Sequence, residues 1–166
     1  MTHTVIRSNP IKKYAAAMAA GLLALVVVGT AQAQVSAEDA VKFRQSGYTF
    51  MQWNMGRIHA MAIEGSVPYN EAQVQAAANV IAAIANSGMG ALYSPETLGV
   101  SGWKMTRLQP NFFDELPKVG EIATNFSQQA TRLQEVAAEG DRAAVAAQLR
   151  EVTQACRSCH QNFRGD

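Results

Sequence analysis

Residues 145–163 read VAAQLREVTQACRSCHQNF, a stretch that combines a helical repeat with a short cysteine motif. Apolar residues recur at spacings of 4, 3, 4, 3 and 4 positions, the period of a helix that buries one face in a bundle: Val145, Leu149, Val152, Cys156, Cys159 and Phe163. At 100° per residue, Cys156, Cys159 and His160 lie within about a third of a turn. The motif therefore lies on the face that the helix buries.

Cys156-Arg157-Ser158-Cys159-His160 has the C-x-x-C-H spacing at which c-type haem is attached. In such sites the two thiols add to the vinyl groups of the porphyrin, and the neighbouring imidazole ligates the iron. We therefore expect one covalently bound haem c, attached through Cys156 and Cys159, with His160 as the axial ligand. The haem is expected to lie in the core of a helical bundle.

Three other interpretations of the two cysteines are weaker. A redox C-x-x-C is typical of a βαβ context, and no segment of this sequence has the pattern of a strand. A zinc site needs a fourth ligand, and outside the first 33 residues the other histidine is His59, far along another predicted helix. A chance pairing of two structural cysteines does not explain the histidine that follows directly.

Residues 1–33 have the three parts of a secretory signal peptide. A positively charged start without an acidic residue precedes an apolar run over 14–29, and Ala31-Gln32-Ala33 matches the cleavage pattern. A permanent membrane anchor is the alternative, but the run is shorter than the ~20 residues that a span needs. We expect cleavage before Gln34 and a periplasmic protein, because the thioether bonds are made outside the reducing cytoplasm.

Cleavage would leave one domain, residues 34–166, with a small negative charge. The chain has 14 Lys and Arg and 13 Asp and Glu, and three of the basic residues (Arg7, Lys12 and Lys13) belong to the leader. The domain then carries 11 basic and 13 acidic residues, a net charge of −2 before the haem. This balance argues against binding to nucleic acid or to an anionic membrane surface.

Helical periodicity and capping residues divide the domain into four helical segments. Helices are expected from Ser36 to about Ile63, from Asn70 to about Ser87, from Asn111 to Gly140 and from Asp141 through the cysteine motif. Pro117 is expected to kink the first turns of the third helix. The connections are short except for one long loop over 88–110. We therefore predict an all-α, antiparallel (up-down-up-down) four-helix bundle.

The first helix has an apolar stripe that includes an arginine: Val41, Arg44, Tyr48, Met51, Met55, Ile58 and Ala62. A guanidinium on a buried face is costly unless it is paired. No acidic residue shares the stripe, so a haem propionate is the evident partner of Arg44.

These features together resemble the cytochrome c′ family, the haem-bearing four-helix bundles of bacterial periplasms. The resemblance covers nearly all of residues 34–166. It rests on Asp39-Ala-Val-Lys-Phe-Arg-Gln-Ser46, Gly56-Arg57, Thr106-Arg107-x-x-Pro110 and Cys156-x-x-Cys159-His160-x-x-Phe163-Arg164. The sequence departs from the family at Phe113, where Trp is usual.

The resemblance implies a role for each matching residue. Cys156 and Cys159 match the attachment points, and His160 matches the proximal ligand. The remaining matches surround the haem: Arg44 and Gln45 at its edge and propionates, Arg107 near the same edge, Arg164 beside the proximal histidine, and Tyr48 over the distal face of the iron.

Tyr48 decides what is expected at the sixth coordination position. Low-spin relatives with this fold have a methionine ligand there, whereas tyrosine ligates only as phenolate, with an ordinary pKa near 10. We therefore expect a five-coordinate, high-spin iron with Tyr48 as a distal lid. Met51 is the alternative ligand, although it is expected in the core with Met55. His59 lies about 16 Å along the helix from Tyr48, too far to bind this iron, and is expected in the first helix's interface.

The resemblance implies electron transfer and binding of NO and CO, with redox proteins of the periplasm as partners, and no enzymatic activity. One alternative is a low-spin electron carrier with Met51 as ligand. Another is a peroxidase, which needs a distal acid–base group that the first helix lacks near Tyr48. A homodimer is expected from the family, and apolar residues off the buried stripes are consistent with it: Phe43, Phe50, Trp53, Val80 and Ala82.

Overall fold

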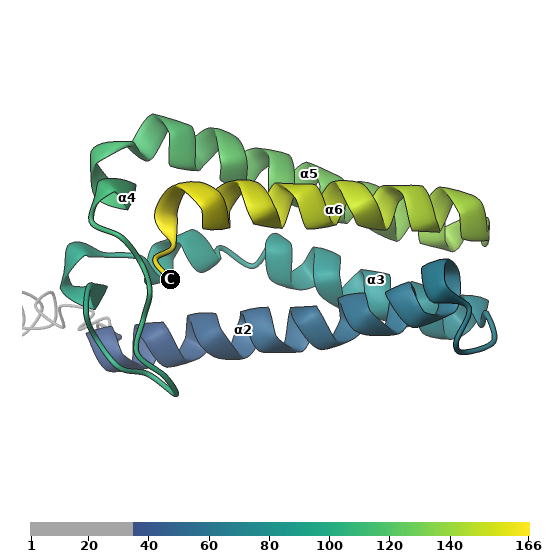
Figure 1. The fold of residues 1–166 in the computed structure, drawn as a ribbon, viewed down its shortest axis with the longest axis horizontal. Helices are drawn as coiled ribbons and strands as arrows, with labels where there is room; N and C mark the ends of the chain where they lie inside the picture. The colour runs from purple at the N-terminus through teal and green to yellow at the C-terminus, as the bar shows by residue number, and fades with distance from the viewer. Residues whose placement is uncertain (1–34) are drawn as a thin grey trace, which may run out of the picture. The chain divides into compact units, whose positions relative to one another are not determined.

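The computed structural model describes residues 35–166 as an antiparallel four-helix bundle (Figure 1). The predicted leader, residues 1–33, lies outside the described residues. In chain order the elements are α2 (Ala37–Ile58), the π-helix η1 (His59–Glu64), α3 (Glu71–Ala85), the 3₁₀-helices η2 (Met89–Leu92) and η3 (Pro95–Thr97), α4 (Asn111–Asp114), α5 (Leu116–Ala138) and α6 (Arg142–Phe163). The predicted fold class is confirmed, and the described residues form no strand beyond isolated bridges.

Three of the predicted helix starts carry side-chain caps. At each one, a side-chain oxygen accepts hydrogen bonds from backbone N–H groups two or three positions further on, which satisfies donors that the first helical turn leaves free. The bonds join Ser36 to Asp39 (3.1 Å), Asn70 to Gln73 (2.9 Å), and Asp141 to Ala143 (2.8 Å) and Ala144 (3.2 Å).

The first helix ends differently from the prediction. Its last six residues form the π-helix η1, and Gly65, with φ of 69°, terminates it. The carbonyl of Ala62 accepts a hydrogen bond from Arg142 Nε at 3.1 Å. His59 is exposed and lies 3.3 Å from Glu64, so its expected place in the helix interface is wrong.

The third helix is interrupted rather than bent. Its first turn is α4, Glu115 leaves the helical conformation with φ of −114° and ψ of 35°, and α5 begins at Leu116 with Pro117 in its first turn. Proline has no N–H to donate and restricts the residue before it, which accounts for a break where a kink was expected.

The main hydrophobic core fills only one part of the bundle. It comprises buried residues from 51–62 of the first helix, 74–81 of α3, 130–137 of α5 and 145–152 of α6. Ala82, expected on an outer surface, is 3% exposed within the bundle, because α3 buries a wider face than predicted.

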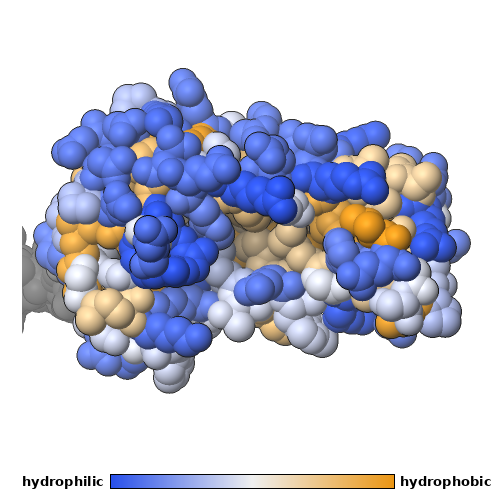
Figure 2. All heavy atoms as spheres, viewed as in Figure 1, coloured by the Kyte–Doolittle hydropathy of each residue, from blue (hydrophilic) through white to orange (hydrophobic). Residues whose placement is uncertain are grey.

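The four helices do not pack equally around the bundle. Helices α2 and α3, α3 and α5, and α5 and α6 pack along each other, whereas α2 and α6 meet over few residues and α6 contacts η1 instead. Figure 1 shows α2 and α6 apart over the half that holds the C-terminal end of α6. Figure 2 shows a hollow in the surface between them, floored by apolar residues. Across residues 35–166, no helix combines the length and the hydropathy that a membrane crossing requires.

Candidate haem site

The main hydrophobic core stops at Val152 on α6, and the next positions of the heptad stripe are Cys156 and Cys159. Both cysteines are free and half-buried, and beyond them Phe163 is fully buried. Burial raises the pKa of Cys156 to about 11, with a smaller contribution from Cys159, and burial also raises the pKa of Cys159. The helix therefore presents two neighbouring protonated thiols where the packed core ends.

Tyr48 of α2 faces these thiols. Burial raises the pKa of its hydroxyl, the hydrogen bond to Tyr93 lowers it, and the nearby Cys159 and Cys156 raise it further. The Tyr48 and Tyr93 hydroxyls share a hydrogen bond of 2.9 Å. Although it lies on the inward stripe, Tyr48 is 43% exposed, because no core side chain covers it. Its phenol is neutral at neutral pH and borders the uncovered space.

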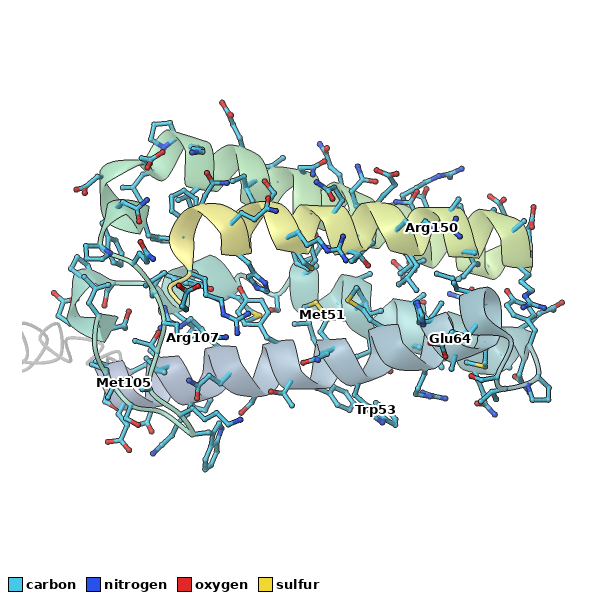
Figure 3. All side chains as sticks on the ribbon, in the orientation of Figure 1. Met51, Trp53, Glu64, Met105, Arg107 and Arg150 are labelled. Atoms are coloured by element: carbon cyan, nitrogen blue, oxygen red, sulfur yellow. The ribbon has the colours of Figure 1, made fainter. Side chains whose placement is uncertain are left out.

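Met51 lies one turn further along α2 in a different environment. Figure 3 shows its side chain on the side of α2 that faces α6. It is 3% exposed and belongs to the main core, against which Met55 also packs. Packing on all sides therefore holds the thioether of Met51 in the core.

Arg44 is a buried cation without an anionic partner. It is 4% exposed, its Nη1 donates a 3.4 Å hydrogen bond to Thr97 Oγ1, and its guanidinium stacks 4.2 Å from the centre of the Tyr93 ring. None of the ion pairs within residues 35–166 includes Arg44. Desolvation lowers its pKa, which is the response of a charge that lacks compensation. A carboxylate of a bound ligand, buried beside this guanidinium, would supply the missing counter-charge.

Gln45 is occupied by the protein itself. Its Nε2 donates to the Lys104 carbonyl at 2.7 Å, and its Oε1 accepts from the Lys104 N–H at 3.1 Å. Beside it, Trp103 Nε1 donates to Ser46 Oγ at 2.9 Å. These bonds fasten the long loop to α2, and the expected contact of Gln45 with the haem stays a prediction.

His160, Arg107 and Arg164 come together at the end of α6. They line a shallow open pocket together with Gln161, Gly165 and Asp166. Arg164 Nη1 lies 3.5 Å from His160 Nδ1. Partial burial, and secondarily the charge of Arg107, lowers the pKa of His160, which favours the neutral imidazole that ligates metals.

Backbone pairing holds the loop against the end of α6. The Gln109 N–H donates to the Phe163 carbonyl at 2.9 Å, and the Gly165 N–H donates to the Arg107 carbonyl at 2.8 Å. This pairing places Arg107 beside the histidine, although the two are 53 positions apart in the sequence.

Sequence reasoning missed the contribution of residues 93–97. Tyr93 contacts both Tyr48 and Arg44, and Thr97, which is 1% exposed, binds Arg44. A loop has no periodicity that would show which of its residues point inward. Two features of the sequence could have pointed to this segment, namely the length of the loop and the absence of an acidic partner for Arg44.

These residues fit a c-type haem. Two thiols and an imidazole stand at the required spacing on one helix, a buried cation lacks an anion, and the core stops where a porphyrin would complete it. Among the described residues, no group of three or more His, Cys, Asp or Glu side chains forms another metal site.

Comparison with known proteins agrees with this fit. The family model described as Cytochrome C' matches residues 39–164. A cytochrome c′ from Allochromatium vinosum is 51% identical over 154 residues, which cover 92% of this chain and 98% of that protein.

Two solved structures show the same fold. A cytochrome c′ described as having an unusual ligand-controlled dimer dissociation is 50% identical, with a TM-score of 0.74 over 79% of this chain and 98% of that one. The nitric oxide complex of a mutant cytochrome c prime from Alcaligenes xylosoxidans is 26% identical, with a TM-score of 0.69 over 79% of this chain and 98% of that one.

Proposed function

The chain belongs to the cytochrome c′ family and carries a covalently attached c-type haem, and we propose that it transfers electrons and binds NO and CO at a five-coordinate iron. When bound, the haem would supply an iron that can exchange one electron and bind a small gas. The residues of the chain attach the haem, orient it and control access to it.

The observation that carries this proposal is the contrast between Tyr48 and Met51 on α2. Tyr48 faces the cysteines with a neutral phenol, whereas Met51 is packed in the core. A neutral phenol is a poor iron ligand, and a packed thioether would leave a cavity behind if it moved to the iron. Neither side chain is therefore suited to fill the sixth coordination position.

The other residues provide attachment and charge compensation. The thiols of Cys156 and Cys159 would form the two thioether bonds, and the neutral imidazole of His160 would ligate the iron. A haem propionate would give Arg44 the anionic partner that it lacks. The proposed ligands are NO and CO, which are small and uncharged. The NO complex of the relative from Alcaligenes xylosoxidans supports this choice of ligand.

We propose a binding and electron-transfer role rather than an enzymatic one. Peroxide cleavage needs a distal acid–base group, usually histidine. The polar side chains around Tyr48 are Tyr93 and Arg44, and the nearest histidine on the same helix, His59, pairs with Glu64 at the other end of the bundle.

We also propose that the mature protein is a periplasmic homodimer. The leader pattern of residues 1–33 supports export, and the relative with ligand-controlled dimer dissociation supports a dimer. On the outer face of α2, Phe50 and Trp53 are exposed and stack with ring centres 5.6 Å apart, and Arg57 stacks 4.8 Å from the centre of the Trp53 ring. A second copy of the chain would cover this aromatic face.

Titration of the reduced protein with CO and with NO, followed by the optical spectrum, tests the proposal. We expect each gas to convert the spectrum of the ligand-free protein to that of a single liganded species. A ferrous spectrum that neither gas alters would refute gas binding and favour the Met51-ligated alternative. Peroxidase turnover in the same preparation, at rates well above those of free haem, would refute the non-enzymatic role.

A further inference from the structure

Tyr93 holds the Tyr48 ring in place. The two hydroxyls share a hydrogen bond of 2.9 Å, although the residues come from different parts of the chain, Tyr48 from α2 and Tyr93 from the end of η2. Apart from this bond, the Tyr48 ring stands at the edge of the space where the core stops, and it is 43% exposed. Its hydroxyl has no other hydrogen-bond partner among the described residues.

Tyr93 itself is held by two stacking contacts of its ring. The Arg44 guanidinium stacks 4.2 Å from the ring centre, and the Phe112 ring stacks with a centroid distance of 4.8 Å and an interplanar angle of 14°. Phe112 is 7% exposed and packs edge-on against the buried Phe163 at 5.5 Å. The backbone N–H of Tyr93 also donates to the Gly90 carbonyl at 3.1 Å. Tyr93 is thus anchored by α2, α4 and α6 together.

We propose that Tyr93 is a positioning residue that latches the Tyr48 lid over the gas-binding side of the haem, and so lowers the affinity for gases. This inference rests on the proposed function in one respect, namely that a gas enters the space beside Tyr48. A ligand entering there must displace the Tyr48 ring, and the anchored Tyr93 cannot follow, so the hydrogen bond breaks. Its free energy opposes ligand binding and sets how readily the lid opens.

The size of the effect follows from the net free energy of one neutral hydrogen bond. At about 0.5–1.5 kcal/mol, and with about 1.4 kcal/mol for each factor of ten, the latch lowers gas affinity by roughly two- to twelvefold. Tyr93→Phe removes the hydroxyl but keeps the ring between Arg44 and Phe112. It therefore separates the latch from the packing role of Tyr93.

The experiment measures CO affinity and association rate for the ferrous holoprotein with Tyr93→Phe, with Tyr48→Phe and with both changes. We expect Tyr93→Phe to raise CO affinity roughly two- to twelvefold. In the Tyr48→Phe background, where the bond is already absent, it should have no further effect. Tyr69→Phe is the matched control, because the buried Tyr69 hydroxyl has no protein partner and lies in another part of the bundle. It should leave CO binding unchanged.

A crystal structure of the ligand-free Tyr93→Phe holoprotein gives a readout that does not depend on gas binding. We expect the Tyr48 ring to be displaced or to occupy two rotamers. A Tyr48 ring ordered in its wild-type position would overturn the latch, as would unchanged CO affinity or an equal gain in the Tyr48→Phe background. If the wild-type protein bound no CO, the proposed function would fail, and the position of the Tyr48 ring would still decide the role of Tyr93.

Discussion

Tyr48 and Met51 lie on the same face of α2, one turn apart, and differ in what surrounds them. Met51 is enclosed by the core, and Tyr48 borders the space that the core leaves. The environment of each residue, rather than its position on the helix, distinguishes the proposed lid, Tyr48, from the core residue Met51.

Replacing Tyr48 by Ala should therefore increase CO affinity and association rate in the ferrous protein. Removing the ring relieves steric exclusion, and the loss of a hydrogen bond to the bound ligand, about 0.5–1.5 kcal/mol, opposes this gain. We expect the steric contribution to be larger, because an entering ligand and the ring would compete for the same space. Met51→Ala is the comparison variant: it should destabilise the fold by about 2–5 kcal/mol through a core cavity, with the spin state unchanged. If CO affinity increased in Met51→Ala and not in Tyr48→Ala, Met51 rather than Tyr48 would be the side chain that blocks the iron.

Arg44 should raise the reduction potential of the haem, because a buried positive charge stabilises the reduced, more negative form. Two unit charges about 10 Å apart at an effective dielectric constant of about 20 interact by about 1.7 kcal/mol, on the order of 70 mV for one electron. Arg44→Met should lower the midpoint potential by tens of millivolts. Arg150→Met on the exposed side of α6 is the control and should change it little, because water and salt screen exposed charges. Equal shifts in the two variants would show that Arg44 is not paired with the haem.

The residues that could be predicted from the sequence are those with a local signature. Cys156, Cys159 and His160 form a motif of fixed spacing, and Arg44 stood out as a charge on an apolar stripe. Tyr93 has no such signature, because its place depends on how a loop of irregular backbone folds over α2. The roles of Gln45, Arg107 and Arg164 toward the haem remain predictions, although the structure brings both arginines to His160.

At the scale of elements, local chemistry predicted where helices start and tertiary contacts changed how they continue. Ser36, Asn70 and Asp141 cap helices as expected, because capping involves only the next few residues. The π-helix η1 is joined to the start of α6 by the bond from Arg142 to the Ala62 carbonyl. A partner 80 positions away is not visible in a local pattern.

Gly102 is the position of the loop where an added side chain would collide with α2. A Cβ on Gly102 would lie 2.9 Å from the Lys42 backbone nitrogen and 2.9 Å from Val41 Cγ1. Gly102→Ala should therefore push the loop off the helix, break its bonds to Gln45, and cost about 1–3 kcal/mol of stability. Hydrogen exchange at the Lys104 amide should accelerate.

Gly90→Ala is the matched control for this change, because a Cβ at Gly90 meets no atom within 4 Å. It should leave both stability and exchange at Lys104 near wild type. Equal protection of the Lys104 amide in the two variants would show that close packing at Gly102 does not hold the loop against α2.

For the whole molecule, the uneven distribution of the core links fold to function. One half of the bundle is packed by apolar side chains, and the half that carries the cysteines is left for the haem to complete. The sequence stripes predicted four helices with buried faces, but they did not show that α2 and α6 separate. That separation depends on the packing of all four helices.

The outer face of α2 should form the contact between two copies of the chain. Trp53→Glu places a charge on this face, and because Trp53 is 56% exposed the single-chain fold should be unaffected. We expect sedimentation at micromolar concentration to show a dimer for the wild type and a monomer for Trp53→Glu. Trp103→Glu on the loop is the control and should remain dimeric. A monomeric wild-type protein would refute the dimer. A dimeric Trp53→Glu variant would show that the interface lies elsewhere.

The spin state of the iron at neutral pH reports what occupies the position beside Tyr48, so measuring it is the decisive test of the proposed lid. Optical and paramagnetic resonance spectra of the ligand-free protein should show high-spin iron when oxidised and five-coordinate high-spin iron when reduced. Addition of CO should convert the reduced form to low-spin. A protein that is already low-spin in both oxidation states, with a spectrum that CO leaves unchanged, would show that a side chain occupies the sixth position and that Tyr48 is not the lid.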